Sequence, residues 1–157
     1  MLSEPRRNTR KLRGGGVGLA FCELQYFGKK LQLQPPRNCE IVGGLITPKL
    51  PARIRGHLMF SLYLAPNISR ADISRAIEFL TTTFTSLNKI YSPLQYHYCI
   101  AGDFNQVKPD LIANCMQGLT SLNNKATRKR SCLDHVLSNF PEQFQLGEVV
   151  PPQLFFY

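Results

Sequence analysis

The clearest periodic pattern in the chain lies between Pro66 and Pro93. Hydrophobic residues recur there at spacings of three and four positions, which is typical of an amphipathic helix. They are Ile73, Ala76, Ile77, Leu80, Phe84 and Leu87. Ser69 precedes them as a candidate N-cap, and Asp72 completes an approximate capping box near the positive end of the helix dipole. The sequence therefore predicts a helix that begins after Ser69 and ends near Tyr91.

Apolar runs on both sides of this helix indicate β-strands. Three precede the helix, at residues 17–22, 39–46 and 57–64, and two follow it, at residues 96–101 and 133–137. A second, short helix is expected from Pro109 to about Gly118, because proline is favoured at the start of a helix. The first three strands could be neighbours in one sheet. The order strand, helix, strand predicts an α/β fold.

Length and composition fit one globular domain. The chain has 157 residues, of which 43% are hydrophobic, and this is enough to build a core. Residues 1–13 are polar and basic and contain Pro5, so we expect a flexible basic tail there and the folded domain over residues 14–157. We find no internal repeat and no second domain.

Cysteine usage and hydropathy place the chain in a reducing compartment. The five cysteines are odd in number, widely spaced and without a C-x-x-C pair, which argues against a disulfide framework or a zinc site and for buried free thiols. A charged N-terminus is unlike a secretory signal, and no apolar run is long enough to span a bilayer. We expect a cytoplasmic or nuclear protein with no membrane partner and no small-molecule cofactor.

The formal net charge of +9 favours anionic partners. One basic cluster lies within residues 6–13, where a solvated face and a binding role are both open. The second cluster consists of Lys125, Arg128, Lys129 and Arg130. It directly precedes a candidate site strand, so we expect it to contact nucleic acid.

Candidate chemistry gathers at the end of the strand predicted over residues 96–101. Asp103 and Asn105 follow Gly102 there, and Asp134 lies about thirty residues later in a second motif, residues 131–138. An Asp and an Asn delivered side by side by a strand can hold a scissile phosphate and its attacking water. Phosphodiester chemistry is therefore the leading hypothesis.

Structural interpretations of the same residues remain open. Asp103 could be a turn residue and Asn105 an Asx-turn former, and Tyr63 could be a core or edge tyrosine. His57 and His97 lie in apolar alternating runs without a partner at metal-ligand spacing, which favours a structural role.

Four segments, taken in order, resemble the endonuclease domain of non-LTR retroelement proteins, which belongs to the endonuclease/exonuclease/phosphatase superfamily. They are residues 13–18 (RGGGVG), 61–66 (SLYLAP), 102–105 (GDFN), and 126–128 (ATR) followed by 133–139 (LDHVLSN). Each segment is a weak signal alone, but the ordered set spans nearly the whole chain. The resemblance implies a four-layered α/β sandwich, two face-to-face sheets with helices outside, that cuts DNA with magnesium.

The resemblance also implies roles for individual residues. Tyr63 would help to place the phosphate, Asp103 and Asn105 would bind the attacking water and phosphate oxygens, and Thr127 would donate a hydrogen bond nearby. Asp134 would orient a catalytic histidine from a later Ser-Asp-His motif. Tyr63, Asp103 and Asn105 should therefore lie at the same end of adjacent strands, with Asp134 close to them.

The sequence departs from the family at both ends, so the fold is expected to be incomplete. The family has an Asn and a metal-binding Glu before the glycines and a Ser-Asp-His motif near its end, and neither is found. Glu4, Glu23 and Glu40 do not lie where that ligand belongs, and His135 should point to the face opposite Asp134. The metal ligands are therefore unknown, with Asp103 at most an indirect one.

Three function classes follow. The first is a magnesium-dependent DNA endonuclease domain, which requires either that an upstream segment supplies the missing strands or that the chain is a fragment. The second is a catalytically inactive remnant that binds nucleic acid through its basic surface. The third is an unrelated α/β interaction module. Whether the chain is an enzyme thus depends on the completeness of its site.

Overall fold

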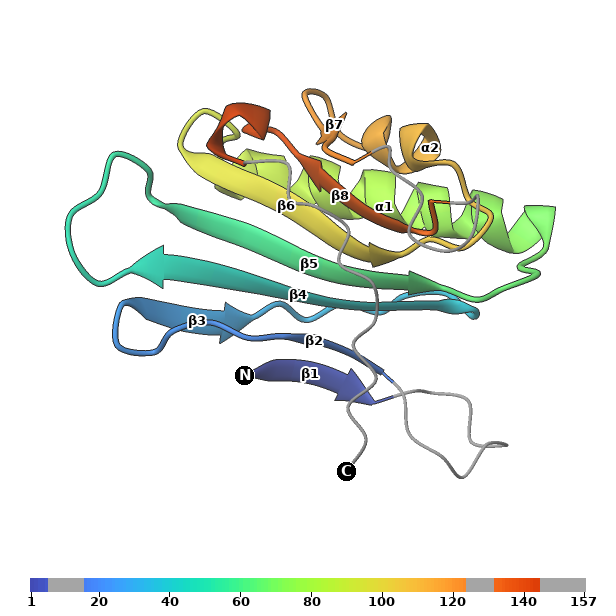
Figure 1. The fold of residues 1–157 in the computed structure, drawn as a ribbon, viewed down its shortest axis with the longest axis horizontal. Coiled ribbons are helices and arrows are strands. Elements are labelled where there is room, and N and C mark those ends of the chain that lie inside the picture. Colours follow the sequence, from blue (N-terminus) through green and yellow to red (C-terminus); the bar gives the residue numbers. More distant parts are fainter. Residues whose placement is uncertain (6–15, 124–131, 145–157) are drawn as a thin grey trace.

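The structure is a computed structural model that describes residues 1–5, 16–123 and 132–144. Its described residues form a six-stranded mixed sheet and a separate two-stranded ribbon, with helices α1 and α2 on one face of the larger sheet (Figure 1). The strand order of the larger sheet is β3-β4-β5-β6-β8-β7. The fold is therefore mixed α/β, as the sequence predicts.

The elements run in the following chain order. The first five strands are β1 (Leu2–Pro5), β2 (Gly16–Leu19), β3 (Tyr26–Lys30), β4 (Cys39–Pro48) and β5 (Gly56–Leu64). The remaining elements are α1 (Arg70–Ile90), β6 (Tyr96–Asp103), α2 (Pro109–Ala113), β7 (Thr120–Ser121), β8 (Asp134–Ser138) and the short 3-10 turn η1 (Pro141–Gln143).

Helix α1 begins and ends where the sequence predicts. Ser69 Oγ accepts a hydrogen bond from Asp72 N at 3.1 Å, and Tyr91 is the C-cap. The Asp72 carboxylate accepts hydrogen bonds from Ser69 Oγ at 2.8 Å and Asn38 Nδ2 at 3.1 Å. Both hydrogen bonds lower the pKa of Asp72, and the bond from Ser69 has the larger effect. The cap therefore also ties the start of α1 to the loop before β4.

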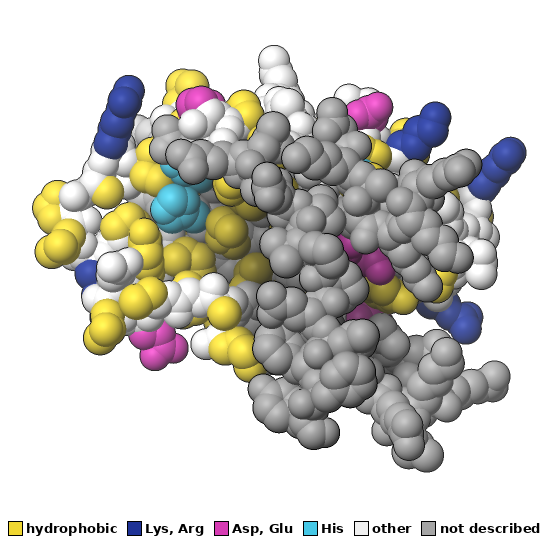
Figure 2. Space-filling model, in the orientation of Figure 1, with side chains coloured by type: hydrophobic (Ala, Val, Ile, Leu, Met, Phe, Trp, Pro, Cys, Tyr) yellow, Lys and Arg dark blue, Asp and Glu magenta, His cyan; other side chains and the backbone are white. Residues whose placement is uncertain are grey.

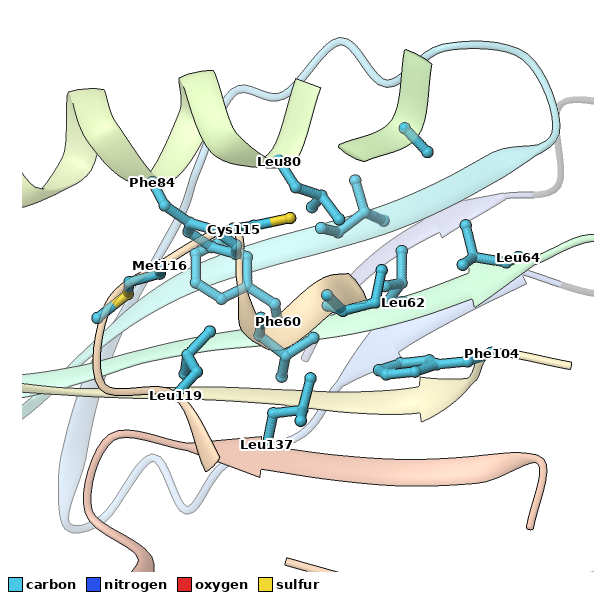
Figure 3. Close-up of a cluster of buried hydrophobic side chains, with 14 of the residues drawn as sticks. Phe60, Leu62, Leu64, Leu80, Phe84, Phe104, Cys115, Met116, Leu119 and Leu137 are labelled. Carbon is cyan, nitrogen blue, oxygen red and sulfur yellow. The ribbon is translucent and has the colours of Figure 1, made fainter. Parts of the chain in front are cut away.

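The core lies between the helices and the larger sheet (Figure 3). Alternate residues of β5 are buried, because successive side chains of a strand point to opposite faces. Phe60 meets Phe84 of α1 edge to face, with ring centroids 5.2 Å apart. Leu62, Leu80 and Phe84 are fully buried, so the helical pattern seen in the sequence is the core-facing side of α1.

The β1–β2 ribbon packs on the face of the larger sheet opposite the helices, which we call the ribbon face. A Cβ added at Gly44 would lie 2.6 Å from Leu2 Cδ1 and 3.5 Å from Leu19 Cδ1. Val42 is 1% exposed although its side chain points away from the helices. Helices, sheet and ribbon thus form successive layers (Figure 1).

Several expectations need correction. Residues 2–5 are not a tail, because they pair with residues 16–19; residues 6–13 of that prediction lie outside the described residues. The strand predicted over residues 17–22 is β2, which joins this ribbon, so only β4 and β5 of the three early strands are neighbours.

The remaining differences are local. The second helix ends at Ala113 rather than near Gly118, and the edge strands β3 and β7 were not expected. All five cysteines are free, and Cys39, Cys99 and Cys115 are buried, but Cys22 is exposed. Within the described residues, no helix is long and apolar enough to cross a membrane.

Candidate functional site

Three of the candidate residues lie in one row across three adjacent strands. Tyr63 of β5 is the register partner of Asp103 of β6, and Asp103 is the register partner of Asp134 of β8. The row crosses the carboxyl ends of β5 and β6, which run parallel. Residues far apart in sequence therefore meet at one end of the sheet, which is the expected juxtaposition.

The row lies on the ribbon face. Leu62 and Leu64 point into the helix-side core, so Tyr63 between them points the other way. On β8, the buried Leu137 and His135 share the helix side, which leaves Asp134 opposite them. Register partners share a face, so Asp103 lies with Tyr63 and Asp134.

Glu40, which the sequence analysis set aside as a metal ligand, extends the row to a fourth strand. It is the register partner of Tyr63 in the antiparallel pair of β4 and β5, and its side chain is partly buried. The order across the sheet is thus Glu40, Tyr63, Asp103, Asp134. A charged residue between the buried Cys39 and Ile41 was the available signal, but only the strand register reveals its neighbours.

Asp103 and Asn105 form a tight turn that closes the end of β6. Asn105 N donates to Asp103 Oδ1 at 2.9 Å, which is an Asx turn, and Asn105 Nδ2 donates to the carbonyl of Leu64 at 2.8 Å. Asn105 has φ 49°, a left-handed conformation that asparagine tolerates. The interpretation of Asp103 as a turn residue is therefore correct, but Asp103 rather than Asn105 forms the Asx turn, and Asn105 supplies the backbone N–H. A carboxylate has several acceptor positions, so the turn leaves Asp103 able to bind a ligand as well.

Asn123 holds the start of β8. Its Nδ2 donates to the carbonyl of Asp134 at 2.6 Å, and its Oδ1 accepts from Val136 N at 2.9 Å. The Asn123 side chain thereby extends the strand pairing beside the candidate row. His135 is only 5% exposed and tilts against the Phe104 ring with centroids 5.2 Å apart, on the face opposite Asp134.

The donor set of the row suits a hard cation in part. Carboxylate oxygens are preferred by magnesium, which is often held by one or two carboxylates together with substrate phosphate and water. Asp103 and Asp134 are direct neighbours and fit that description. Across residues 1–5, 16–123 and 132–144, however, no group of three or more His, Cys, Asp or Glu side chains could hold a metal ion by itself.

Thr127 and the basic residues Lys125, Arg128, Lys129 and Arg130 lie outside the described residues.

At the other end of the ribbon face, His57 and His97 form a pair that the sequence pattern did not suggest. They are register partners, and their ring centroids lie 5.0 Å apart. The His97 ring lies tilted against the Phe140 ring with centroids 3.8 Å apart, and the His57 ring meets the Tyr26 ring edge to face with centroids 6.0 Å apart. Histidine side chains show on this face among hydrophobic ones (Figure 2). Burial lowers the pKa of both, and the charge of His57 lowers the pKa of His97 further.

This pair should make the fold less stable at mildly acidic pH. The folded-state pKa of each imidazole lies below the ordinary 6.5, so the unfolded chain binds more protons between these values. The stability that the neutral pair contributes is fully present above pH 6.5, and it is lost as the pH falls below this value. Urea unfolding should therefore show a free energy that declines from about pH 8 to about pH 5.5. Replacing both residues by phenylalanine should flatten that slope, whereas an unchanged slope would exclude the pair as its source.

Comparison with solved structures identifies the architecture. The chain aligns with the human Nocturnin catalytic domain with bound sulfate anion at a TM-score of 0.65 and 13% sequence identity, covering 87% of this chain and 59% of that chain. A humanized D. rerio TDP2 with 14 mutations aligns at a TM-score of 0.45 and 10% identity, covering 73% of this chain and 48% of that chain. No protein-family model matches the sequence, and no curated protein matches it.

The alignment with the Nocturnin domain concerns the fold alone, because the sequence identity is only 13%. The chain spans 59% of the Nocturnin domain, so an incomplete version of the sandwich is consistent with the alignment. A helix layer, a six-stranded sheet and a ribbon on its opposite face are present in the described residues. The architecture of this chain is therefore that of the endonuclease/exonuclease/phosphatase fold.

Proposed function

We propose that this chain carries the phosphate-binding part of a metal-dependent phosphodiesterase site that acts on DNA and derives from a non-LTR retroelement endonuclease. The supporting observation is the row of Tyr63, Asp103 and Asp134 on adjacent strands. Ligands of open α/β sheets commonly bind beyond the carboxyl ends of the strands, which is where this row lies. The retroelement origin rests on the ordered sequence motifs.

In this proposal the row acts through a cation. Asp103 and Asp134 by themselves repel a phosphodiester, so they would hold a magnesium ion whose charge would offset that repulsion and stabilise charge on the phosphate. Asn105 holds the end of β6 against β5 through its bond to Leu64, which keeps Asp103 beside Tyr63. The Tyr63 hydroxyl would donate a hydrogen bond to a phosphate oxygen.

Magnesium should therefore strengthen DNA binding, which is opposite to its usual competing effect at constant ionic strength. With a short fluorescent duplex, we expect an affinity gain of about tenfold, equivalent to about 1.4 kcal/mol, when magnesium replaces sodium. Asp103→Asn should remove this gain. The new amide oxygen can still accept the bond from Asn105 N, so the turn is preserved.

Asp110→Asn is the matched control, because Asp110 is exposed on α2 and its replacement changes the net charge equally. The control should keep the magnesium-dependent gain. If magnesium weakened binding equally in the parent and both variants, the row would not be a cation-mediated phosphate site.

A non-catalytic nucleic-acid-binding remnant is the second candidate. The net charge of +9 favours it, since phosphate contacts by Lys and Arg need no metal. In that case DNA would bind without magnesium, and Asp103→Asn would strengthen binding by removing a negative charge. The same titrations therefore distinguish the two candidates.

A further inference from the structure

One end of the molecule combines exposed aliphatic and cationic side chains. The amino ends of β5 and β6 lie here, together with three connections: residues 20–25, 49–55 and 91–95. We call them, with the last two residues of α1, the loop end. Backbone hydrogen bonds join these connections to one another: Lys49 N donates to Gln25 O, and Arg55 N donates to Gln95 O, each at 2.9 Å.

Large aliphatic side chains protrude from each of these connections. Leu24 is 88% exposed, Leu50 is 79% exposed and Leu94 is 90% exposed. Ile90, at the end of α1, is 71% exposed. Hydrophobic side chains gather at the left end of the molecule, where the connection between β4 and β5 lies (Figures 1 and 2). Single exposed leucines need no explanation, but a group at one end marks an interaction surface.

The charge of the loop end is strongly asymmetric. Its cations are Lys49, Arg53, Arg55 and Lys89, all exposed; its one acid is Glu23, and Glu142 of η1 lies nearby, close to His97. Glu23 already lies 3.7 Å from the N-terminal amine. The Lys49 ammonium donates to the Glu23 carbonyl and lies 4.9 Å from the centroid of the Phe27 ring, so this cation is held beside an aromatic side chain. The complementary partner is therefore anionic and has an apolar layer within reach.

We infer that the loop end docks on the surface of an anionic phospholipid bilayer. Aliphatic side chains at three separate tips enter the boundary between headgroups and acyl chains, and the surrounding cations bind the anionic headgroups. A DNA backbone offers phosphates but no place for leucine side chains. Such docking lies on the membrane rather than across it, so it needs no spanning helix.

The orientation keeps the candidate row accessible. Leu64 and Gly56 lie at opposite ends of β5, and nine residues of strand extend about 25 Å. The row crosses the Leu64 end, and the loop end lies at Gly56. A chain docked through the loop end would present the row to the solvent side. This inference stands independently of the proposed phosphodiesterase site.

Vesicle co-sedimentation with the full chain tests this inference. We expect binding to phosphatidylcholine vesicles that contain about 30% phosphatidylserine, at least tenfold stronger than to phosphatidylcholine alone. Replacing Leu24, Leu50 and Leu94 together by serine should weaken this binding about tenfold or more. Replacing Arg53, Arg55 and Lys89 together by alanine should weaken it to a similar extent.

Two controls separate docking from general charge attraction. The first replaces Arg37, Arg70 and Lys108 by alanine, three exposed cations near the opposite end of the sheet, with the same change in net charge. The second is Leu111→Ser, at an exposed leucine of α2. Both should keep binding within about twofold of the parent. Circular dichroism melting confirms that each variant is folded.

Several results would overturn the inference. Equal losses in the two cation variants would indicate diffuse charge attraction. Binding to neither vesicle would exclude the membrane. If the parent chain ran as a dimer on gel filtration, the triple leucine variant ran as a monomer, and neither bound vesicles, the loop end would be assigned to self-association. If the triple leucine variant still bound vesicles, and if short duplex DNA competed this binding away, the cations would instead be assigned to nucleic-acid binding.

Discussion

Supercoiled plasmid is expected to remain intact when the purified chain is incubated with it in magnesium or manganese. Among the described residues, the candidate row combines the carboxylates of Glu40, Asp103 and Asp134 with Tyr63. His135, beside Asp134 in sequence, is buried on the opposite face and cannot act as its partner. The row as described thus holds no histidine base, and removing one of a set of interdependent catalytic groups costs about four to six powers of ten in rate, so we expect turnover below detection.

The assay measures conversion of supercoiled plasmid to the relaxed form over several hours. An Asp103→Ala variant, prepared in parallel, reveals contaminating nuclease, because a contaminant would nick in both samples. Nicking by the parent chain but not by the variant would contradict this prediction. It would mean that residues not placed in the row supply the missing base and metal ligand.

Replacing Gly102 with alanine is expected to prevent stable folding. Gly102 has φ 153°, and a Cβ there would lie 1.8 Å from the Leu62 carbonyl oxygen and 2.8 Å from its carbonyl carbon. These are backbone atoms of the neighbouring strand, so the clash cannot be relieved by rotating a side chain. We expect a loss of more than about 4 kcal/mol, a large part of the stability of an ordinary domain.

Gly118→Ala is the matched control. Gly118 also has a left-handed φ, 88°, but a Cβ there would meet no atom within 4 Å. It should therefore cost only the conformational penalty, about 1–2 kcal/mol. Urea unfolding measures both variants. Similar losses would show that β6 can move away from β5 at Gly102, and the close pairing that aligns Asp103 with Tyr63 would then be less rigid than the structure indicates.

Local chemistry determined the helical part of the structure. Hydrophobic spacing, the Ser69 cap and the turn at Tyr91 predicted α1 to within a residue, because capping and amphipathic periodicity act within one or two turns of chain. The same holds for β4, β5 and β6, whose apolar runs match the strands closely. The fold class followed from their order.

Weakly patterned segments were decided by tertiary contacts. Residues 2–5 read as a polar tail, yet they pair with residues 16–19, and Leu2 packs against the sheet at Gly44. Edge strand β3 is only five residues long and contains Gly28 and two lysines, and it forms beside β4. Such strands depend on partners distant in sequence, so local pattern gives little signal for them.

The candidate site divides in the same way. The sequence by itself indicated candidate residues, since Asp103, Asn105 and Tyr63 lie at or just beyond the ends of strongly apolar strands. It also predicted that His135 and Asp134 would face opposite ways, because side chains alternate along a strand. Only the tertiary structure joined Glu40 to this row, and only it brought His57 beside His97. Those pairings depend on strand register, which arises from packing across the whole sheet and not from either strand alone.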